Sequence, residues 1–222
     1  MLIYYITDRT QFAGNAAEQR IQLLETVRRA AAAEVDFIQL REKDLSTREL
    51  ESLAREVLSA IRTAGPSRLL INHRTDVALA VGADGVHLTG ADIAPSDVRA
   101  LATLCRPSEP FLIAASCHSA AQVRLAEASG ADFAVLAPIF EKLNVSAHGI
   151  GLGELRRAAH PEPALRANAA DVRRSFPVFA LGGVDAVRVS LCAAAGAAGV
   201  AGIRLVQQSP DLLALVRSIR AL

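Results

Sequence analysis

The chain has 222 residues, 51% of them hydrophobic and 4% aromatic, and its 24 basic side chains nearly balance 23 acidic ones to give a net charge of +1. This length fits one large domain with a full core, which alanine, valine and leucine must largely pack. The balanced charge argues against a nucleic-acid-binding surface and against an electrostatic membrane anchor.

Eight short apolar runs follow one another along the chain, nearly all of them separated by segments of helix length. They lie at 2–7, 35–40, 68–72, 86–88 and 111–116, after Asp132, at 177–181 and after Gly196. Continuous apolar runs that alternate with helices indicate parallel strands that are buried on both faces.

A repeat relates half of these runs to one another. Asp36, Asp84 and Asp132 recur at intervals of 48 residues, and a fourth copy that begins at Gly196 follows after 66 residues, the extra length falling in an insertion at 160–175. Two strand–helix units, present about four times, predict a (β/α)8 TIM barrel, an α/β fold with a single domain over 1–222. The alternative is an open doubly wound sheet, but it does not explain the period, and no GxGxxG follows the first strand.

The end of the second run, Gln39-Leu40-Arg41-Glu42-Lys43-Asp44, is the most informative segment of the sequence. A TIM barrel carries its active site at the C-terminal ends of its strands. Arg41 and Lys43 lie two positions apart, on one face of the segment, and fixed cations at this place suit a phosphate-bearing ligand. The alternative is a solvated loop that opens the next helix.

The ends of the seventh and eighth runs form a second candidate anion site. Gly182 and Gly183 let backbone N–H groups approach phosphate oxygens, although a tight turn with positive φ would also require glycine. Ile203 and Arg204 follow the eighth run, where Arg204 adds a charged clamp or faces solvent. Two anion sites across the barrel mouth suit a substrate with phosphates at both ends, or two phosphorylated substrates.

Other strand ends supply candidate catalytic and metal-binding residues. Asp92 is a candidate ligand for Mg²⁺ that bridges a diphosphate, or it caps the helix that begins near Pro95. Ser116 and His118 follow the fifth run, and His118 is a candidate general base or an exposed loop residue. His87 lies inside its strand and is expected to be structural.

These strand ends resemble, in order and over nearly the whole chain, the thiamine phosphate synthase family and the related thiazole tautomerases. The specific motifs are Gln39-Leu40-Arg41-Glu42-Lys43-Asp44, Ile71-Asn72-x-Arg74-x-Asp76, Gly82-Ala83-Asp84-Gly85-Val86-His87-Leu88, Ser116-x-His118-Ser119 and Ala180-Leu181-Gly182-Gly183-Val184. The resemblance implies a transferase in which an aminopyrimidine diphosphate loses pyrophosphate with the help of Mg²⁺. The nitrogen of a thiazole phosphate then traps the pyrimidinylmethyl cation.

The resemblance also implies roles for individual residues. The predicted catalytic residues are Ser116, His118 and Lys43, and the predicted metal ligands are Asp92 and His73. The predicted substrate-binding residues, which hold the diphosphate at one end and the thiazole phosphate at the other, are Gln39, Arg41, Lys43, Asn72, Lys142, Gly182, Gly183, Ile203 and Arg204.

Three positions depart from the family pattern. His73 stands where the family has a metal-binding aspartate, the loop from Phe140 to Gly149 lacks a Thr-x-Thr-Lys sequence that Lys142 partly replaces, and Arg204 replaces a small residue. The first two changes would also fit a thiazole tautomerase that uses His118 as its base and needs no Mg²⁺. A non-catalytic binder of phosphate ligands is the third alternative.

Cysteine usage and the terminal sequence bear on the compartment. Cys105, Cys117 and Cys192 are far apart and form no CxxC, which favours a reducing cytoplasm over a disulfide framework or zinc site. No signal peptide and no membrane span are expected, and the oligomeric state stays open, a homo-oligomer included.

Overall fold

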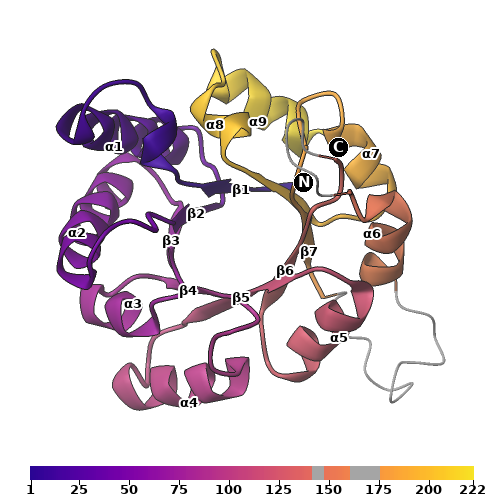
Figure 1. Cartoon of the computed structure of the whole chain (residues 1–222), viewed down its shortest axis with the longest axis horizontal. Coiled ribbons are helices and arrows are strands. Elements are labelled where there is room, and N and C mark those ends of the chain that lie inside the picture. The colour runs from indigo at the N-terminus through magenta and orange to yellow at the C-terminus, as the bar shows by residue number, and fades with distance from the viewer. Residues whose placement is uncertain (142–147, 161–175) are drawn as a thin grey trace.

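The computed structural model describes residues 1–141, 148–160 and 176–222. Within them, eight parallel strands close into a barrel in chain order, and the helices surround it (Figure 1). The TIM-barrel prediction is confirmed. Lys142 and most of the predicted insertion lie outside the described residues.

The strands agree closely with the predicted runs. They are β1 (Leu2–Ile6), β2 (Phe37–Leu40), β3 (Arg68–Asn72), β4 (Gly85–Leu88), β5 (Leu112–Cys117), β6 (Phe133–Leu136), β7 (Val178–Ala180) and β8 (Gly199–Gly202). β2 begins two residues later than predicted, at Phe37, and the turn before it contains Glu34, whose φ is 60°. β7 is shorter at both ends than the predicted 177–181.

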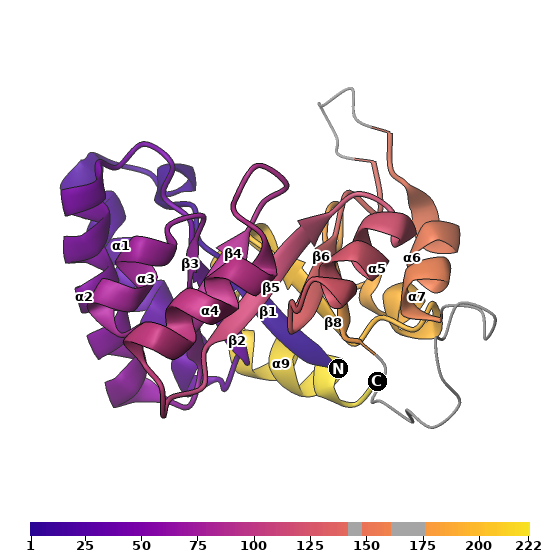
Figure 2. The ribbon, with the colours of Figure 1, turned by 90° about the horizontal axis from the view of Figure 1, so that it is seen from below.

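The helices lie outside the barrel, between successive strands except for the last two, which follow β8. They are α1 (Ala16–Ala32), α2 (Thr47–Ala64), α3 (Thr75–Val81), α4 (Pro95–Cys105), α5 (Ala120–Ala128), α6 (Gly151–Ala159), α7 (Val189–Ala194), α8 (Arg204–Gln207) and α9 (Leu212–Arg220), with a 3-10 turn η1 (Arg9–Gln11). Asn15 and Ser46 form capping boxes that fix the starts of α1 and α2. Both ends of the described chain lie beside α9 (Figure 2), where the Met1 amino group donates to the Ile219 carbonyl at 3.2 Å. No described helix is long and apolar enough to cross a membrane.

The repeated aspartates have a structural role at the N-terminal ends of the strands. Asp36, Asp84 and Asp132 each accept a hydrogen bond from the backbone N–H of the second residue of the preceding strand, at 2.7 to 2.8 Å. Each also pairs with an arginine from a covering helix, namely Arg220, Arg62 and Arg99. The repeat therefore ties β1 to β2, β3 to β4 and β5 to β6, far from the predicted active-site end.

Four aromatic rings fill the barrel interior toward the N-terminal ends of the strands. Tyr4, Phe37, Phe133 and Phe179 contact one another with ring centroids 5.1 to 6.0 Å apart. Gly199 leaves room for this cluster, because a Cβ there would approach the Phe179 ring to 2.4 Å. The apolar plug closes one end of the barrel, and polar side chains occupy the other.

Candidate active site

The loop after β2 is held in place by a buried ion-pair network. Arg9 donates to Glu42 Oε2 at 3.0 Å and to both Asp44 oxygens at 2.6 and 2.7 Å, while Thr7 Oγ1 donates to Glu42 Oε1 at 2.6 Å. Burial raises the pKa of Glu42, and the hydrogen bonds from Thr7 and Arg9 oppose that rise. Arg9 lowers the pKa of Asp44. The carboxylates of the motif thus serve to fix its shape.

The cations of the same motif line a cavity beside the carboxylates that bind Arg9. Arg41 and Lys43 line a cavity of about 250 Å³ at the barrel mouth, together with Asp8, Thr10, Glu42 and Asp44. Arg41 is half-buried and Lys43 is exposed. Because Arg9 already binds Glu42 and Asp44, these two carboxylates do not compete for Arg41 and Lys43, which suits the binding of an anionic ligand.

The two predicted metal ligands meet in space. Nδ1 of His73 contacts Oδ1 of Asp92, and the Asp92 side chain is only 6% exposed. The other Asp92 oxygen accepts hydrogen bonds from the backbone N–H and the hydroxyl of Thr89, at 2.6 and 2.9 Å. Asp92 does not cap α4, because Ala94 stands at that position. Among the residues that the structure describes, no three His, Cys, Asp or Glu side chains gather around one point.

This donor set fits Mg²⁺ only as a cation shared with a ligand. Mg²⁺ prefers oxygen donors and is commonly held by one or two carboxylates together with substrate phosphates and water. Asp92 offers one oxygen, and imidazole is a poor ligand for so hard an ion. The site therefore fits a cation that a diphosphate brings with it, with Asp92 as its protein ligand.

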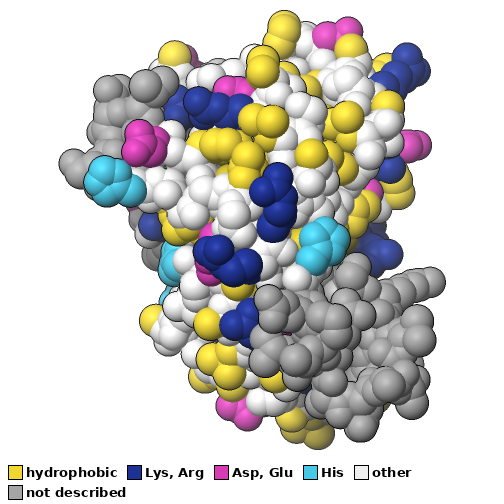
Figure 3. Space-filling model, turned by 90° about the vertical axis from the view of Figure 1, so that its right-hand side faces the viewer, with side chains coloured by type: hydrophobic (Ala, Val, Ile, Leu, Met, Phe, Trp, Pro, Cys, Tyr) yellow, Lys and Arg dark blue, Asp and Glu magenta, His cyan; other side chains and the backbone are white. Residues whose placement is uncertain are grey.

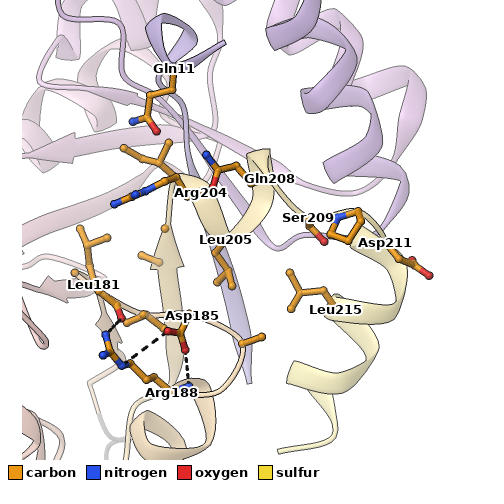
Figure 4. A pocket seen from close by; sticks show the side chains of 18 of the residues that line it. Gln11, Leu181, Asp185, Arg188, Arg204, Leu205, Gln208, Ser209, Asp211 and Leu215 are labelled. Atoms are coloured by element: carbon orange, nitrogen blue, oxygen red, sulfur yellow. Dashed lines mark hydrogen bonds and ion pairs between the residues drawn. The ribbon is translucent and has the colours of Figure 1, made fainter. Parts of the chain in front are cut away.

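A larger cavity, of about 690 Å³, opens at the ends of β7 and β8 and is lined by Gly182, Gly183, Ile203 and Arg204 (Figure 4). Within the described chain, no hydrogen bond uses the backbone N–H of these four residues. N–H groups without a partner at the wall of a cavity suit phosphate oxygens.

The glycine pair also has a packing role. Gly182 and Gly183 both have positive φ, at 97° and 65°. A Cβ on Gly182 would come within 2.7 Å of Pro138, and one on Gly183 within 2.9 Å of Phe140. Both of the alternatives considered for these glycines, the tight turn and the close approach to a ligand, are thus compatible with their geometry.

Two arginines at this cavity differ in their freedom. The Arg188 guanidinium is held by contacts within the protein, since it donates to the Gly183 carbonyl at 2.8 Å and lies 4.9 Å over the Phe140 ring. Arg204 is exposed, and in Figure 4 its guanidinium extends toward the space between Gln11 and Leu181. On the molecular face in Figure 3, basic side chains stand among acidic, apolar and neutral ones, in keeping with the balanced charge.

The end of β5 brings three functional side-chain types together. His118 is exposed, and its Nδ1 lies 2.8 Å from the Ala137 carbonyl, so the neutral ring donates there and leaves Nε2 as an acceptor. Burial raises the pKa of Cys117 to about 11, which keeps it a thiol and excludes it as a nucleophile at neutral pH. Ser116 Oγ lies 2.8 Å from Nε2 of His87.

Some contributors to the site were not assigned from the sequence. Thr7 and Arg9 lie at the end of the first strand but pair with a motif more than 30 residues away. Tyr4 looks like an ordinary core residue in the sequence, yet its hydroxyl contacts Gln39 and His87 inside the barrel. Only the strand order and register reveal these contacts.

Comparison with known proteins agrees with this geometry. A profile of the thiamine monophosphate synthase family matches residues 3–206. The thiamine-phosphate synthase of Methanoculleus marisnigri is 37% identical to the chain over 223 residues, which cover 98% of this chain and 93% of the relative. That of Methanoregula boonei is 34% identical over 223 residues, which cover 98% of this chain and 91% of the relative. The solved structure of thiamine phosphate pyrophosphorylase from Pyrococcus furiosus aligns with a TM-score of 0.75 and 27% identity, over 99% of this chain and 94% of that one. The chain belongs to the thiamine monophosphate synthase family.

Proposed function

We propose that this protein is a thiamine-phosphate synthase, a transferase that joins a hydroxymethylpyrimidine diphosphate to a thiazole phosphate and releases pyrophosphate. The observation that carries the proposal is the pair of cavities at one end of the barrel. The residues that line one include Arg41 and Lys43, and the other is lined by N–H groups after β7 and β8 that have no partner among the described residues. Two phosphorylated substrates need two such places. The names of the similar proteins support the same activity.

The reaction divides the work between these places. Arg41 and Lys43 bind the diphosphate, with Gln39 and Asn72 against the pyrimidine. As the C–O bond breaks, its electrons leave with pyrophosphate, and the cations and Ser116 stabilise that charge where it develops. The thiazole nitrogen then forms the new C–N bond with the pyrimidinylmethyl carbon. Lys142 is proposed as a further contact to the diphosphate.

The glycine cavity holds the other substrate in this proposal. Gly182, Gly183 and Ile203 bind the thiazole phosphate through backbone N–H groups, and Arg204 adds a guanidinium at the rim. Mg²⁺ is the proposed cofactor, with Asp92 as its protein ligand and His73 as the neighbour of that carboxylate. When bound, the ion neutralises part of the charge on the leaving pyrophosphate.

The decisive experiment combines the protein with the pyrimidine diphosphate and the thiazole phosphate and follows pyrophosphate release, with and without Mg²⁺. We expect release that requires both substrates and Mg²⁺, and loss of release in Asp92→Ala. A matched variant, Asp97→Ala, changes an exposed carboxylate in the first turn of α4 and is expected to keep full activity. No release under any condition would refute the proposal.

Thiazole tautomerase is the second candidate, and the geometry of His118 favours it. Because its Nδ1 donates to the Ala137 carbonyl, Nε2 carries a free lone pair at the barrel mouth and can take a proton. A tautomerase would interconvert thiazole isomers without Mg²⁺ and lose that activity in His118→Ala. The synthase proposal predicts pyrophosphate release instead, so the two assays separate the candidates, and ligand binding without turnover would indicate a non-catalytic binder.

A cytoplasmic location is also proposed. The three cysteines are free thiols, with Cys117 and Cys192 buried and Cys105 exposed, as a reducing compartment would allow. Fractionation of the source cells, with the labelled protein detected in each fraction, would test this location directly.

A further inference from the structure

A chain of hydrogen bonds crosses the inside of the barrel. Gln39 Nε2 in β2 donates to the Tyr4 hydroxyl in β1 at 3.3 Å, and that hydroxyl lies 3.1 Å from Nδ1 of His87 in β4. Nε2 of His87 lies 2.8 Å from the Ser116 hydroxyl in β5. Four strands thus contribute one side chain each, and the chain ends at the half-buried Ser116.

Burial limits the protonation states in this chain. Tyr4 is fully buried and His87 is 3% exposed. Burial, with a smaller effect of the Arg41 charge, lowers the pKa of His87 to about 3, and burial raises the pKa of Tyr4. At neutral pH, His87 is therefore an uncharged ring with a single N–H, and Tyr4 keeps its proton.

The direction of the hydrogen bonds follows from counting hydrogens. The Tyr4 oxygen already accepts from Gln39, and the one other polar atom of the described chain within hydrogen-bond distance of it is Nδ1 of His87. If Nδ1 carried the histidine hydrogen, the Tyr4 O–H would be buried without an acceptor, which is unfavourable. Tyr4 therefore donates to Nδ1, and the histidine hydrogen lies on Nε2 and is donated to Ser116.

We propose that Tyr4 and His87 are positioning residues that turn the Ser116 O–H toward the ligand at the barrel mouth. Because the Ser116 oxygen already accepts the hydrogen on Nε2, its own hydrogen points away from His87. The inference rests on the proposed function, in which that ligand is the diphosphate. Ser116 then acts as a preset donor to the departing pyrophosphate and needs no reorientation during the reaction.

The tautomer of His87 is the first test, and it needs no substrate. Long-range proton–nitrogen spectra of the ¹⁵N-labelled protein, with the His87 signals assigned by their loss in His87→Gln, are expected to show hydrogen on Nε2 and none on Nδ1. The opposite tautomer would overturn the inference. Tyr4→Phe is expected to raise the population of the His87 tautomer that carries its hydrogen on Nδ1. Tyr5→Phe is the matched control, because the buried Tyr5 hydroxyl has no hydrogen-bond partner among the described residues.

A double-mutant cycle is the second test. His87→Leu is expected to lower kcat for pyrophosphate release about tenfold, the effect of a misdirected hydrogen bond to a charged group, while KM for the thiazole phosphate stays unchanged. His87→Gln, which can donate an amide hydrogen near the position of Nε2, is expected to restore most of this loss.

The cycle is completed in the Ser116→Ala background. There His87→Leu is expected to cause no further loss, because His87 acts through Ser116. Additive losses would indicate a purely structural role and overturn the inference. If the unmodified protein releases no pyrophosphate, the proposed function has failed, and the same cycle is measured as the dissociation constant for inorganic pyrophosphate.

Discussion

At the scale of single residues, the motif after β2 assigns different work to alternating positions. All four residues line the same cavity, but Glu42 and Asp44 bind Arg9 and hold the loop, which leaves Arg41 and Lys43 to meet a ligand. The resemblance to a known family implied the cations as ligand-binding residues. The partner of the carboxylates could not be predicted, since nothing in the local sequence connects Arg9 with residues more than 30 positions away.

If Arg41 and Lys43 bind the ligand, removing either positive charge should weaken binding of the pyrimidine diphosphate. Arg41→Gln and Lys43→Gln should each lower kcat/KM for the pyrimidine diphosphate about 10- to 100-fold, because each removes a charge-assisted hydrogen bond. Steady-state kinetics of pyrophosphate release provide the measurement. Arg48→Gln, at an exposed position of α2, is the control and should change the rate less than about twofold. Equal losses in all three variants would mean that the cations act only through overall charge.

His87 also predicts a pH dependence of stability. Its pKa is about 3 in the folded protein against 6.5 for the free side chain, because the buried ring resists protonation. Between these values the unfolded chain binds one more proton than the folded one, so stability falls as the pH drops from 6.5 towards 3. The slope from this residue approaches about 1.4 kcal/mol per pH unit.

Urea unfolding at a series of pH values measures this contribution. His87→Gln should remove it, so that the curves of the variant and the unmodified protein converge as the pH falls. Gln22→Ala, which removes a side chain that does not titrate, serves as the control and should leave the curve parallel to that of the unmodified protein. A parallel curve for His87→Gln would contradict the prediction.

At the scale of elements, the repeat explains one strained turn. Gly82, Gly130 and Gly196 end their helices with positive φ, and Glu34 occupies the equivalent place in the first copy, also with positive φ. A side chain in this left-handed conformation costs about 1–2 kcal/mol, which exceeds the flexibility that glycine loses on folding. The turn after α1 is thus built for glycine but carries glutamate.

Glu34→Gly should therefore raise the free energy of unfolding by about 0.5–1 kcal/mol. A glycine two residues earlier, in Ala32→Gly, should lower it by about 0.5–1 kcal/mol, because that residue is helical. Urea denaturation of the two variants measures both effects. A loss of stability in Glu34→Gly would show that the glutamate side chain makes a compensating contact.

Much of this element structure could be predicted from the sequence, for a physical reason. Parallel strands covered on both faces need continuous apolar runs, so the runs at 68–72 and 111–116 mark β3 and β5 almost to the residue. Contacts between strands could not be predicted in the same way. The link from Tyr4 to His87 depends on which strands face each other across the barrel, which no local pattern records.

At the scale of the whole molecule, the two ends of the barrel have separate tasks. The aspartates of the repeat tie the strands at their N-terminal ends, and the cavities open at the C-terminal ends. Such a separation should let stability change without any change in substrate binding.

Asp84→Ala tests this separation. The substitution leaves the Leu69 N–H without its acceptor and Arg62 without its partner, so the free energy of unfolding should fall by about 1–3 kcal/mol. KM for both substrates should stay within about twofold of the unmodified protein. A large rise in either KM, with the protein still folded by circular dichroism, would show that the two ends are coupled.

The fourth copy of the repeat carries Ala198 where the other three have aspartate. Three pairs of neighbouring strands are thus fastened by a carboxylate, while β7, only three residues long, joins β8 through two register pairs, Phe179 with Gly199 and Ala180 with Val200. The contact between β7 and β8 is therefore expected to be the weakest of these strand pairs, and amide hydrogen exchange should be fastest there among the strands. Because a thiazole phosphate held by the loops after β7 and β8 would contact both strands' ends, the substrate itself would supply the additional link that the missing carboxylate does not provide.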